Sequence, residues 1–208
     1  MIRIENVYTC GWEQAIMGMR NPLNSWAKSD TTFFSSGPFI GPNDLDLMRK
    51  LIRSGPEHRK FLRFIHVAMD ITAPIYWWKE YDTYKIGTAC NSCSTMHTLH
   101  KRDLTLDDFS DDWLGFEGVQ CLMSVIEQIN KFRQKYVAEE NAALKKGYWY
   151  QMVQLLPTSF NQLRTVDLNY EVALNIIHQR TGHKLVEWHD MVNSLRALPH
   201  MEDFLNES

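Results

Sequence analysis

Residues 155–188 read LLPTSFNQLRTVDLNYEVALNIIHQRTGHKLVEW, and this stretch decides which fold the chain adopts. A Leu-Pro pair and a polar turn precede one amphipathic run, in which residues 168–179 have the apolar spacing of a helix. Gly182 is expected to end this helix, and residues 184–198 are expected to form the next one. Four polar side chains lie among the apolar residues of the run and are the first candidates for ligand binding: Asn169, Asn175, Arg180 and His183.

Length and composition indicate one soluble globular domain over residues 1–208. Hydrophobic residues make up 44% of the chain and charged residues 23%, which suits a single buried core. No apolar run reaches the roughly 18 residues of a membrane span, and the N-terminus lacks a signal-peptide core. The net charge of −3 gives no global basic field for nucleic acid. We therefore expect a cytoplasmic protein without membrane or nucleic-acid partners, in which a small anionic ligand needs a local basic pocket.

The rest of the chain combines strand-like and helical patterns. In chain order the patterns predict a strand at 1–10, a helix at 12–19 and a loop over 20–43 with a surface excursion at 35–44. They then predict a helix at 44–52 capped by Asn43 or Asp44, a strand-like run at 61–74, a helix at 75–85 and the longest helix at 118–146. Such a mixture of strands and long helices indicates an α/β (α+β) protein.

The cysteines do not indicate a disulfide framework, because four at irregular spacing are too few. In a reducing compartment we expect thiols or core residues instead. One segment has the C-x2-C-x3-H-x2-H pattern of a zinc site: Cys90, Cys93, His97 and His100. On one continuous helix these residues would span about 15 Å, too far for a single tetrahedral ion. A zinc-binding module is therefore the less favoured alternative, and no metal ligand is predicted.

Aromatic residues are concentrated in residues 76–84, which contain Tyr76, Trp77, Trp78, Tyr81 and Tyr84. Such rings can stack on an isoalloxazine or a base, but packing in the core or between subunits is the favoured interpretation. The sequence has no phosphate-binding P-loop, no nucleophile elbow and no dinucleotide GxGxxG motif. It therefore argues against the enzyme classes that use these motifs.

The polar residues of the opening stretch resemble the C-terminal motif of the flavin-dependent thymidylate synthases. In that family an Asn opens the helix, a second Asn follows six residues later and an Arg five residues after that, and Asn169, Asn175 and Arg180 have this spacing. The resemblance implies that the asparagines help to hold flavin and that Arg180 binds a uridine nucleotide. It also implies a flavin contact for His183, and it matches Glu187 four residues further on.

Residues 61–97 resemble the signature region of the same family, with departures. The lead-in ITAPIY, at 71–76, is very similar to the ending of the family's strand. The family's basic residue and Gln fall on Lys79 and Glu80, and its Arg-His-Arg triplet falls on Thr83, Tyr84 and Lys85. The other correspondences are Asn91 for an Asn, Ser92 for a nucleotide-binding Glu, Cys93 or Ser94 for a Ser, and Met96 and Val153 for two arginines.

The resemblance implies a flavoprotein with a single domain, a mostly antiparallel sheet and long helices, as in the thymidylate synthase-complementing proteins. It implies FAD as cofactor, NADPH and methylene-tetrahydrofolate as co-substrates, and methylation of dUMP to dTMP or of a related pyrimidine nucleotide. No catalytic side chain is expected, because the cofactor carries the hard step. The predicted nucleotide-binding residues are Arg180, Ser94, Lys85, Glu80 and Ser92. The predicted FAD-binding residues are Asn169, Asn175, His183, Lys79, Asn91 and Thr88.

The resemblance also implies a homotetramer, because the family binds flavin and nucleotide between subunits. The substitutions in the signature region leave a second function open. Met96 and Val153 cannot supply the charge-assisted donors that arginine offers to a phosphate. The alternative is therefore a non-catalytic nucleotide-binding or interaction protein that has the fold without the phosphate-binding residues.

Overall fold

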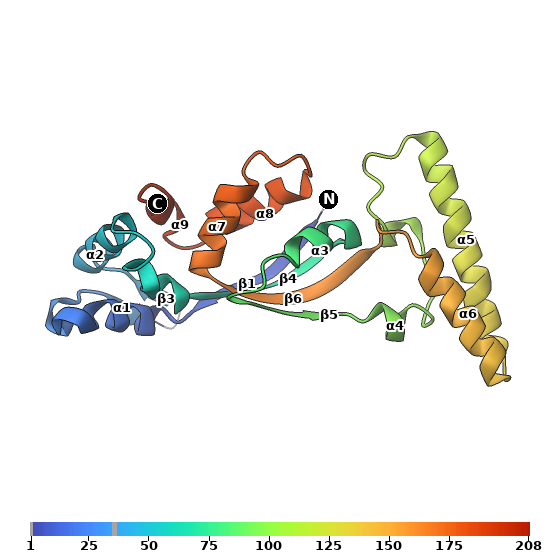
Figure 1. The fold of residues 1–208 in the computed structure, drawn as a ribbon, viewed down its shortest axis with the longest axis horizontal. Coiled ribbons are helices and arrows are strands. Elements are labelled where there is room, and N and C mark those ends of the chain that lie inside the picture. Colours follow the sequence, from blue (N-terminus) through green and yellow to red (C-terminus); the bar gives the residue numbers. More distant parts are fainter. Residues whose placement is uncertain (1, 35–36) are drawn as a thin grey trace. The chain divides into compact units, whose positions relative to one another are not determined.

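The computed structural model describes residues 2–34 and 37–208 (Figure 1). Its elements in chain order are β1 (Arg3–Cys10), α1 (Trp12–Arg20), η1 (Asn21–Leu23), η2 (Trp26–Lys28), β2 (Thr32–Phe34), β3 (Gly37–Phe39), α2 (Pro42–Arg53), η3 (Arg59–Arg63), β4 (His66–Pro74), α3 (Ile75–Tyr81), β5 (Thr88–Ser92), α4 (Thr95–Thr98), η4 (Leu106–Asp108), α5 (Phe116–Ala138), α6 (Ala142–Leu155), β6 (Asn161–Asn169), α7 (Tyr170–Arg180), α8 (Glu187–Arg196) and α9 (Met201–Leu205). None of the described helices has both the length and the apolar character needed to cross a membrane.

The described residues divide into two compact units. The first, which we call the hairpin unit, comprises Ile2 and Arg3 together with residues 71–83 and 91–164. The second, which we call the C-terminal unit, comprises residues 4–70 (apart from 35 and 36), 84–90 and 165–208. The expectation of one domain over residues 1–208 stays a prediction.

Four strands form one antiparallel sheet in the order β1–β4–β6–β5, so the mixed α/β class expected from the sequence is confirmed. β4 has the predicted alternation, because Val67, Met69 and Ile71 are buried whereas His66 and Asp70 are partly exposed. A side chain on every second position of a strand faces the same side, which places these apolar residues on one face. The predicted strand at 61–74 begins late, because its first residues form the short helix η3.

In the hairpin unit, two helices replace the single long helix predicted at 118–146. The chain leaves the helical conformation at Glu139, and α6 begins after Asn141, whose side chain accepts hydrogen bonds from the backbone N–H groups of Ala143 and Leu144 at 3.0 and 3.2 Å. An Asn in this position stabilises the start of a helix by about 1 kcal/mol. α5 and α6 then lie side by side (Figure 1).

The core of the helical pair is apolar. Its buried members on α5 are Leu122, Ile126 and Ile129, and Met152 of α6 packs into the same cluster. The apolar pattern that predicted one helix therefore comes from the facing sides of two helices, α5 and α6. A second buried group in this unit consists of Trp77, Trp78 and Tyr81, whose ring centroids lie 4.9–5.4 Å apart. These rings are core residues, as the favoured interpretation expected.

In the C-terminal unit, aromatic rings join α1 to α7 and α9. The Trp12 and Tyr170 rings meet edge to face with centroids 5.2 Å apart, and Tyr170 also packs against Phe204. The Tyr170 hydroxyl donates a hydrogen bond to the carbonyl of Pro199 at 3.1 Å. Burial raises the pKa of Tyr170, so this hydroxyl keeps its proton and its role as donor.

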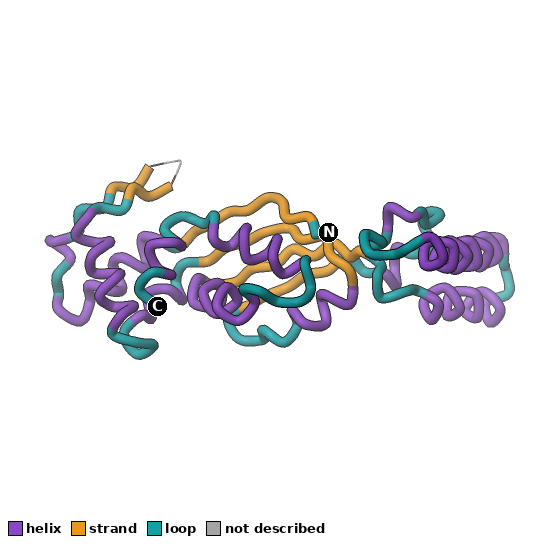
Figure 2. The backbone as a smooth tube through the Cα atoms, turned by 90° about the horizontal axis from the view of Figure 1, so that it is seen from above, coloured by secondary structure: helices purple, strands orange, loops and turns teal. Residues whose placement is uncertain are grey.

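The segment 20–43, predicted as a loop, contains regular structure. β2 and β3 pair antiparallel with Thr32 opposite Phe39, and they are the separate short orange pair in Figure 2. Ser35 and Ser36 of the predicted surface excursion lie outside the described residues, as does Met1 of the predicted first strand. The predicted cap of α2 is wrong, because Gly41 holds the N-cap position and Asp44 lies inside the helix.

Asp44 is instead half of a buried ion pair. It is fully buried, and Arg20 is 4% exposed. Arg20 Nη2 lies 2.6 Å from Asp44 Oδ1, while Oδ2 accepts hydrogen bonds from the hydroxyls of Ser29 and Thr31, each at 2.7 Å. Burial raises the pKa of Asp44, but these hydrogen bonds and the charge of Arg20 outweigh it and hold the pKa below its usual value.

Candidate functional site

Arg180 lies at the C-terminal end of α7 and is held by two aromatic rings of the C-terminal unit. Its Nε donates a hydrogen bond to the Tyr84 hydroxyl at 2.9 Å, and its guanidinium carbon lies 4.5 Å from the centre of the Trp188 ring. The Tyr84 hydroxyl in turn donates to Gln179 at 2.9 Å. Arg180 is partly buried, so the structure presents a positioned guanidinium and not a solvated side chain.

His183 lies against the same guanidinium. Its Nε2 lies 3.2 Å from Arg180 Nη1, and because a guanidinium only donates, the ring nitrogen accepts this hydrogen bond. The other ring nitrogen, Nδ1, lies 3.2 Å from the backbone nitrogen of Leu185. The imidazole therefore helps to hold Arg180 in its position.

Asn169 opens α7 as the resemblance expected, but its carbonyl oxygen is already engaged. Asn169 Oδ1 accepts a hydrogen bond from the N–H of Val172 at 3.0 Å, and only 8% of the residue is exposed. Gly87 lies directly against it, because a Cβ at Gly87 would stand 2.6 Å from Asn169 Nδ2. Gly87 also has a φ of +74°, a conformation that favours glycine. Asn169 therefore caps the helix and fixes the loop before β5.

The other predicted residues of the C-terminal unit are more exposed. Asn175 lies on α7 with its side chain in solvent, and Lys85 is exposed next to Tyr84. Thr88 is partly buried at the start of β5, and its hydroxyl donates to the carbonyl of Tyr84. Within this unit the structure therefore brings Arg180 and His183 into contact, and Tyr84 links them to the segment that carries Lys85 and Thr88.

The remaining predicted residues belong to the hairpin unit. Lys79 and Glu80 lie on α3, with Lys79 exposed and Glu80 partly buried. Asn91 and Ser92 end β5 and are exposed, and Ser94 precedes α4 as its N-terminal cap residue. Cys93, the other residue at the position of the family's Ser, lines a cavity of about 470 Å³.

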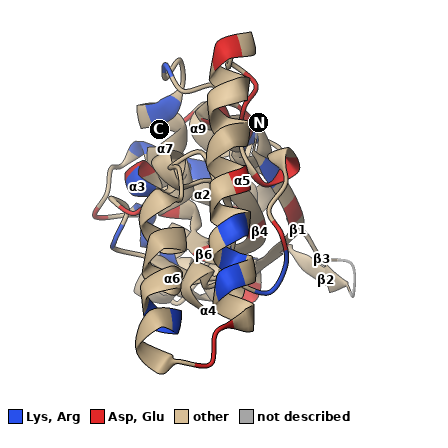
Figure 3. Ribbon diagram, turned by 90° about the vertical axis from the view of Figure 1, so that its right-hand side faces the viewer, with Lys and Arg blue, Asp and Glu red and all other residues tan. Residues whose placement is uncertain are grey.

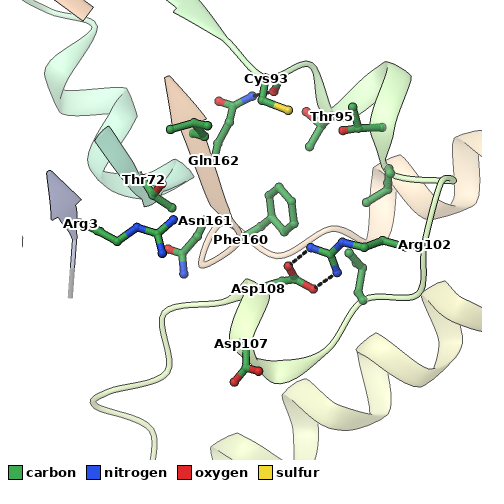
Figure 4. A pocket seen from close by; sticks show the side chains of 14 residues that line it. Arg3, Thr72, Cys93, Thr95, Arg102, Asp107, Asp108, Phe160, Asn161 and Gln162 are labelled. Atoms are coloured by element: carbon green, nitrogen blue, oxygen red, sulfur yellow. Dashed lines mark hydrogen bonds and ion pairs between the residues drawn. The ribbon is translucent and has the colours of Figure 1, made fainter. Parts of the chain in front are cut away.

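Figure 4 shows this cavity with its polar side chains. Cys93, Thr95 and Gln162 lie at one end of it, and Arg3 and Arg102 lie on opposite sides. Arg102 is committed to Asp108 through two hydrogen bonds, one of them 2.8 Å long. Burial raises the pKa of Asp108, but the Arg102 guanidinium outweighs it and lowers the pKa, so the pair stays ionised. Arg102 therefore braces the wall of this cavity.

Two positions where the family has arginine carry apolar side chains in different surroundings. Val153 packs against the apolar cluster between α5 and α6. Met96 lies on α4 and is 48% exposed, and its carbonyl accepts a hydrogen bond from the Trp149 indole at 3.2 Å. Neither side chain supplies a positive charge.

The zinc-like segment is not the continuous helix that the sequence argument assumed. Cys90 lies in strand β5, Cys93 follows it, and His97 and His100 lie in and after α4. Within the described residues, no group of three or more His, Cys, Asp or Glu side chains is arranged to hold a metal ion. All four cysteines are free and exposed, so the expectation of thiols is confirmed and the alternative of core residues is wrong.

Sequence reasoning missed the partners that position Arg180. Trp188 was expected only as part of the predicted helix at 184–198, and Tyr84 only as a position where the family's His is replaced. Sequence reasoning also missed Lys145 and Lys146, which it placed only within the predicted helix at 118–146. The signal available for these lysines was the aromatic run Tyr148–Tyr150 that follows them, because basic and aromatic residues together are typical of anion and nucleotide sites.

The sequence matches no protein-family model, and it matches no curated protein. Solved structures, by contrast, have the same fold, and that fold is the one found in the flavin-dependent thymidylate synthases. The resemblance drawn from residues 61–97 and 155–188 is therefore confirmed at the level of the fold.

Three solved structures define the likeness. Thymidylate synthase X from Helicobacter pylori, solved with FAD and dUMP, has a TM-score of 0.69 at 17% identity, over 99% of this chain and 97% of that chain. A second structure of that enzyme with FAD and dUMP has a TM-score of 0.67 at 17% identity, over 98% and 99% of the two chains. A UMP/dUMP methylase, PolB from Streptomyces cacaoi, bound with 5-Br UMP, has a TM-score of 0.53 at 15% identity, over 84% and 74%.

Proposed function

We propose that this chain is a divergent flavin-dependent thymidylate synthase-like protein that binds FAD and methylates a pyrimidine nucleotide at C5. In this proposal dUMP or a related nucleotide is the substrate, and NADPH and methylene-tetrahydrofolate are co-substrates. Support comes from the fold, because two structures that share it contain FAD and dUMP and a third contains 5-Br UMP. The site geometry supplies the second, independent support.

The observation that carries the proposal is the arrangement around Arg180. Arg180 Nη1 lies 3.2 Å from His183 Nε2 in a hydrogen bond, and the Tyr84 and Trp188 rings flank the guanidinium. A guanidinium in a fixed position is a strong partner for a phosphate or for the carbonyl oxygens of a uracil ring. Such an arrangement suits an anionic ring compound better than it suits an apolar one.

Two polar groups, one in the middle of α7 and one just after its end, offer contacts that suit part of a flavin. The exposed Asn175 amide and the His183 ring offer hydrogen bonds of the kind that an isoalloxazine accepts and donates. Asn169 fits less well, because its Oδ1 caps α7. We therefore assign the flavin contacts of this unit to Asn175 and His183, and we assign Asn169 to positioning.

No side-chain nucleophile is required by this function. FAD, when bound, supplies the hydride chemistry, and the protein binds and orients the reactants. The role of Arg180 is to hold the negative charge of the nucleotide, and the roles of Tyr84 and Trp188 are to hold Arg180. Ser94, Ser92 and the other predicted residues of the hairpin unit stay proposals for the same ligand.

FAD binding is the first test of this function. Purified protein mixed with FAD at micromolar concentration is expected to retain the yellow cofactor through gel filtration, as measured by its visible absorbance. Asn175→Ala is expected to weaken FAD binding about fivefold or more, the loss of one net hydrogen bond of about 1 kcal/mol. His178→Ala is the matched control on the same helix, since its imidazole contacts only the Ser208 hydroxyl among the side chains described. Loss of FAD from the unmodified protein would refute the cofactor part of the proposal.

A homotetramer is part of the same proposal. Large apolar side chains are exposed before and at the first residue of α5, where Trp113 is 82% and Phe116 81% exposed, and a subunit contact would cover them. Multi-angle light scattering at micromolar concentration is expected to give four times the chain mass of 24.4 kDa. A mass of one chain would contradict a site shared between subunits. We also place the protein in the cytoplasm.

One observation favours the non-catalytic alternative. Val153 is partly buried against an apolar cluster, so one of the family's phosphate-binding arginines has no counterpart there. FAD binding without oxidation of NADPH, in the presence of dUMP and methylene-tetrahydrofolate, would support a binding protein in place of an enzyme.

A further inference from the structure

A second cavity in the hairpin unit has basic and aromatic walls. Its volume is about 450 Å³, which lies within the range of roughly 300–1,000 Å³ that small-molecule sites occupy. Six of its lining residues are basic or aromatic: Lys145, Lys146, His97, His100, Tyr136 and Trp149. None of the described residues that line it is acidic. Figure 3 shows basic residues near the start of α6, the helix that provides both lysines of these walls.

Lys145 is held in place at the edge of this cavity. Its ammonium donates a hydrogen bond to the carbonyl of Glu139 at 3.2 Å and lies 5.1 Å from the centre of the Tyr136 ring. An ammonium group has three N–H donors, so one bond to a carbonyl leaves donors for a ligand. The neighbouring carboxylate of Glu139 is engaged elsewhere, because it accepts the N–H of Asn141 at 2.9 Å.

The aromatic walls are fixed by contacts from two directions. The Trp149 indole donates to the carbonyl of Met96 at 3.2 Å, which joins α6 to α4. The His100 and Tyr136 rings lie with their centroids 5.0 Å apart. His100 Nδ1 is buried, so the His100 ring serves here as part of the wall.

We propose that this cavity binds the phosphate group of a small aromatic phosphate ester. Lys145 and Lys146 neutralise the phosphate, and Trp149 and Tyr136 provide flat surfaces for the ring. The choice of a pyrimidine nucleotide as that ester rests on the proposed function. The volume of the cavity is that of a small-molecule site, which favours a free nucleotide over a nucleic-acid strand.

The test is isothermal titration calorimetry with UMP, and with uridine as the same ring without phosphate. Lys145→Gln combined with Lys146→Gln removes both charges and keeps much of each side chain's length. This double variant is expected to weaken UMP binding at least about tenfold, since two charge-assisted contacts are lost, and to leave the weaker uridine binding nearly unchanged. Lys131→Gln is the control, because Lys131 is an exposed lysine of α5 paired with Glu127 at 2.7 Å. Thermal unfolding of each variant checks that the helices remain folded.

Each outcome decides one question. Unchanged UMP affinity in the double variant overturns the cavity proposal, as does an equal loss in Lys131→Gln. Tighter binding of a single-stranded oligonucleotide than of UMP through the same lysines also overturns it. If Arg180→Ala weakens UMP binding while the double variant does not, the proposed function stands and only the cavity proposal fails. If only the double variant weakens it, the cavity proposal stands and the Arg180 site fails.

Discussion

Replacing Arg180 by alanine is expected to weaken dUMP binding at least about tenfold, because a charge-assisted contact contributes about 1.5–3 kcal/mol. The guanidinium is already held by the Tyr84 hydroxyl and the Trp188 ring, so little side-chain entropy is lost when a ligand binds. Calorimetric titration with dUMP, with FAD present, measures the change. Arg180→Lys tests the geometry, because lysine keeps the charge but cannot form the planar fork, and it should recover only part of the affinity.

Lys184→Ala provides the comparison for Arg180. Lys184 is an exposed cation four residues further along the chain, so its removal changes the net charge equally. Its loss is expected to leave the dUMP affinity within about twofold, since exposed charges are screened by salt. If Arg180→Ala changes only the thermal stability and not the affinity, Arg180 is a structural residue and the proposed nucleotide site is wrong.

The largest expected effect on stability follows from replacing Arg20 by methionine. This change leaves Asp44 fully buried without its cationic partner, and breaking a buried ion pair in this way typically costs about 3–5 kcal/mol. Urea denaturation followed by circular dichroism measures the free energy of unfolding. Arg196→Met is the control, because its ion pair with Glu202 is exposed, and such pairs contribute under about 1 kcal/mol. Similar losses in the two variants would contradict the assignment of Asp44 as a buried charge.

The same pair predicts how stability depends on pH. The pKa of Asp44 is lower in the folded protein than its ordinary value of 3.8. Its contribution is therefore complete above the pKa of the unfolded chain, and it is lost as the pH falls through the lower folded pKa. In the Arg20→Met protein the charge and the hydrogen bonds of Arg20 are absent while burial remains. The pKa of Asp44 in the folded variant then rises, so the free energy of unfolding that is lost on acidification becomes smaller.

Local sequence patterns predicted the elements with one apolar face and a clear terminator. β4 is an example, because Val67, Met69 and Ile71 alternate with more polar residues and Pro74 ends the run. β6 was missed and assigned to a turn and the start of a helix. In the first half of β6, apolar residues do not alternate with polar ones between a buried and an exposed face, because Leu163 is exposed whereas Arg164 is partly buried. The two-residue period that marks a strand is therefore absent there.

The division between α5 and α6 was missed for a different reason. The break at residues 139–141 contains no Gly or Pro, and the apolar spacing continues up to Val137. Only Asn141 marks the boundary, and an Asn within a helical pattern is a weak signal when it is read alone.

The site was predictable only where it depends on spacing along one helix. The interval from Asn169 to Arg180 placed the cap at one end of α7 and the guanidinium at the other, and both positions are as expected. The contact between Arg180 and Tyr84 joins residues 96 positions apart, and no local pattern specifies such a pair. The basic and aromatic cavity likewise depends on the tertiary packing of α4 against α5 and α6.

The most direct test of the central claim, that this chain binds FAD and a pyrimidine nucleotide at one site, is the visible absorption spectrum of the FAD-loaded protein during titration with dUMP. We predict a saturable change in the flavin band, because a nucleotide bound next to the isoalloxazine alters its polarity and hydrogen bonding. The same titration with Arg180→Ala is expected to need at least about ten times more dUMP for half-saturation. A flavin spectrum that stays unchanged up to millimolar dUMP, or a protein that retains no FAD to be observed, would contradict the claim.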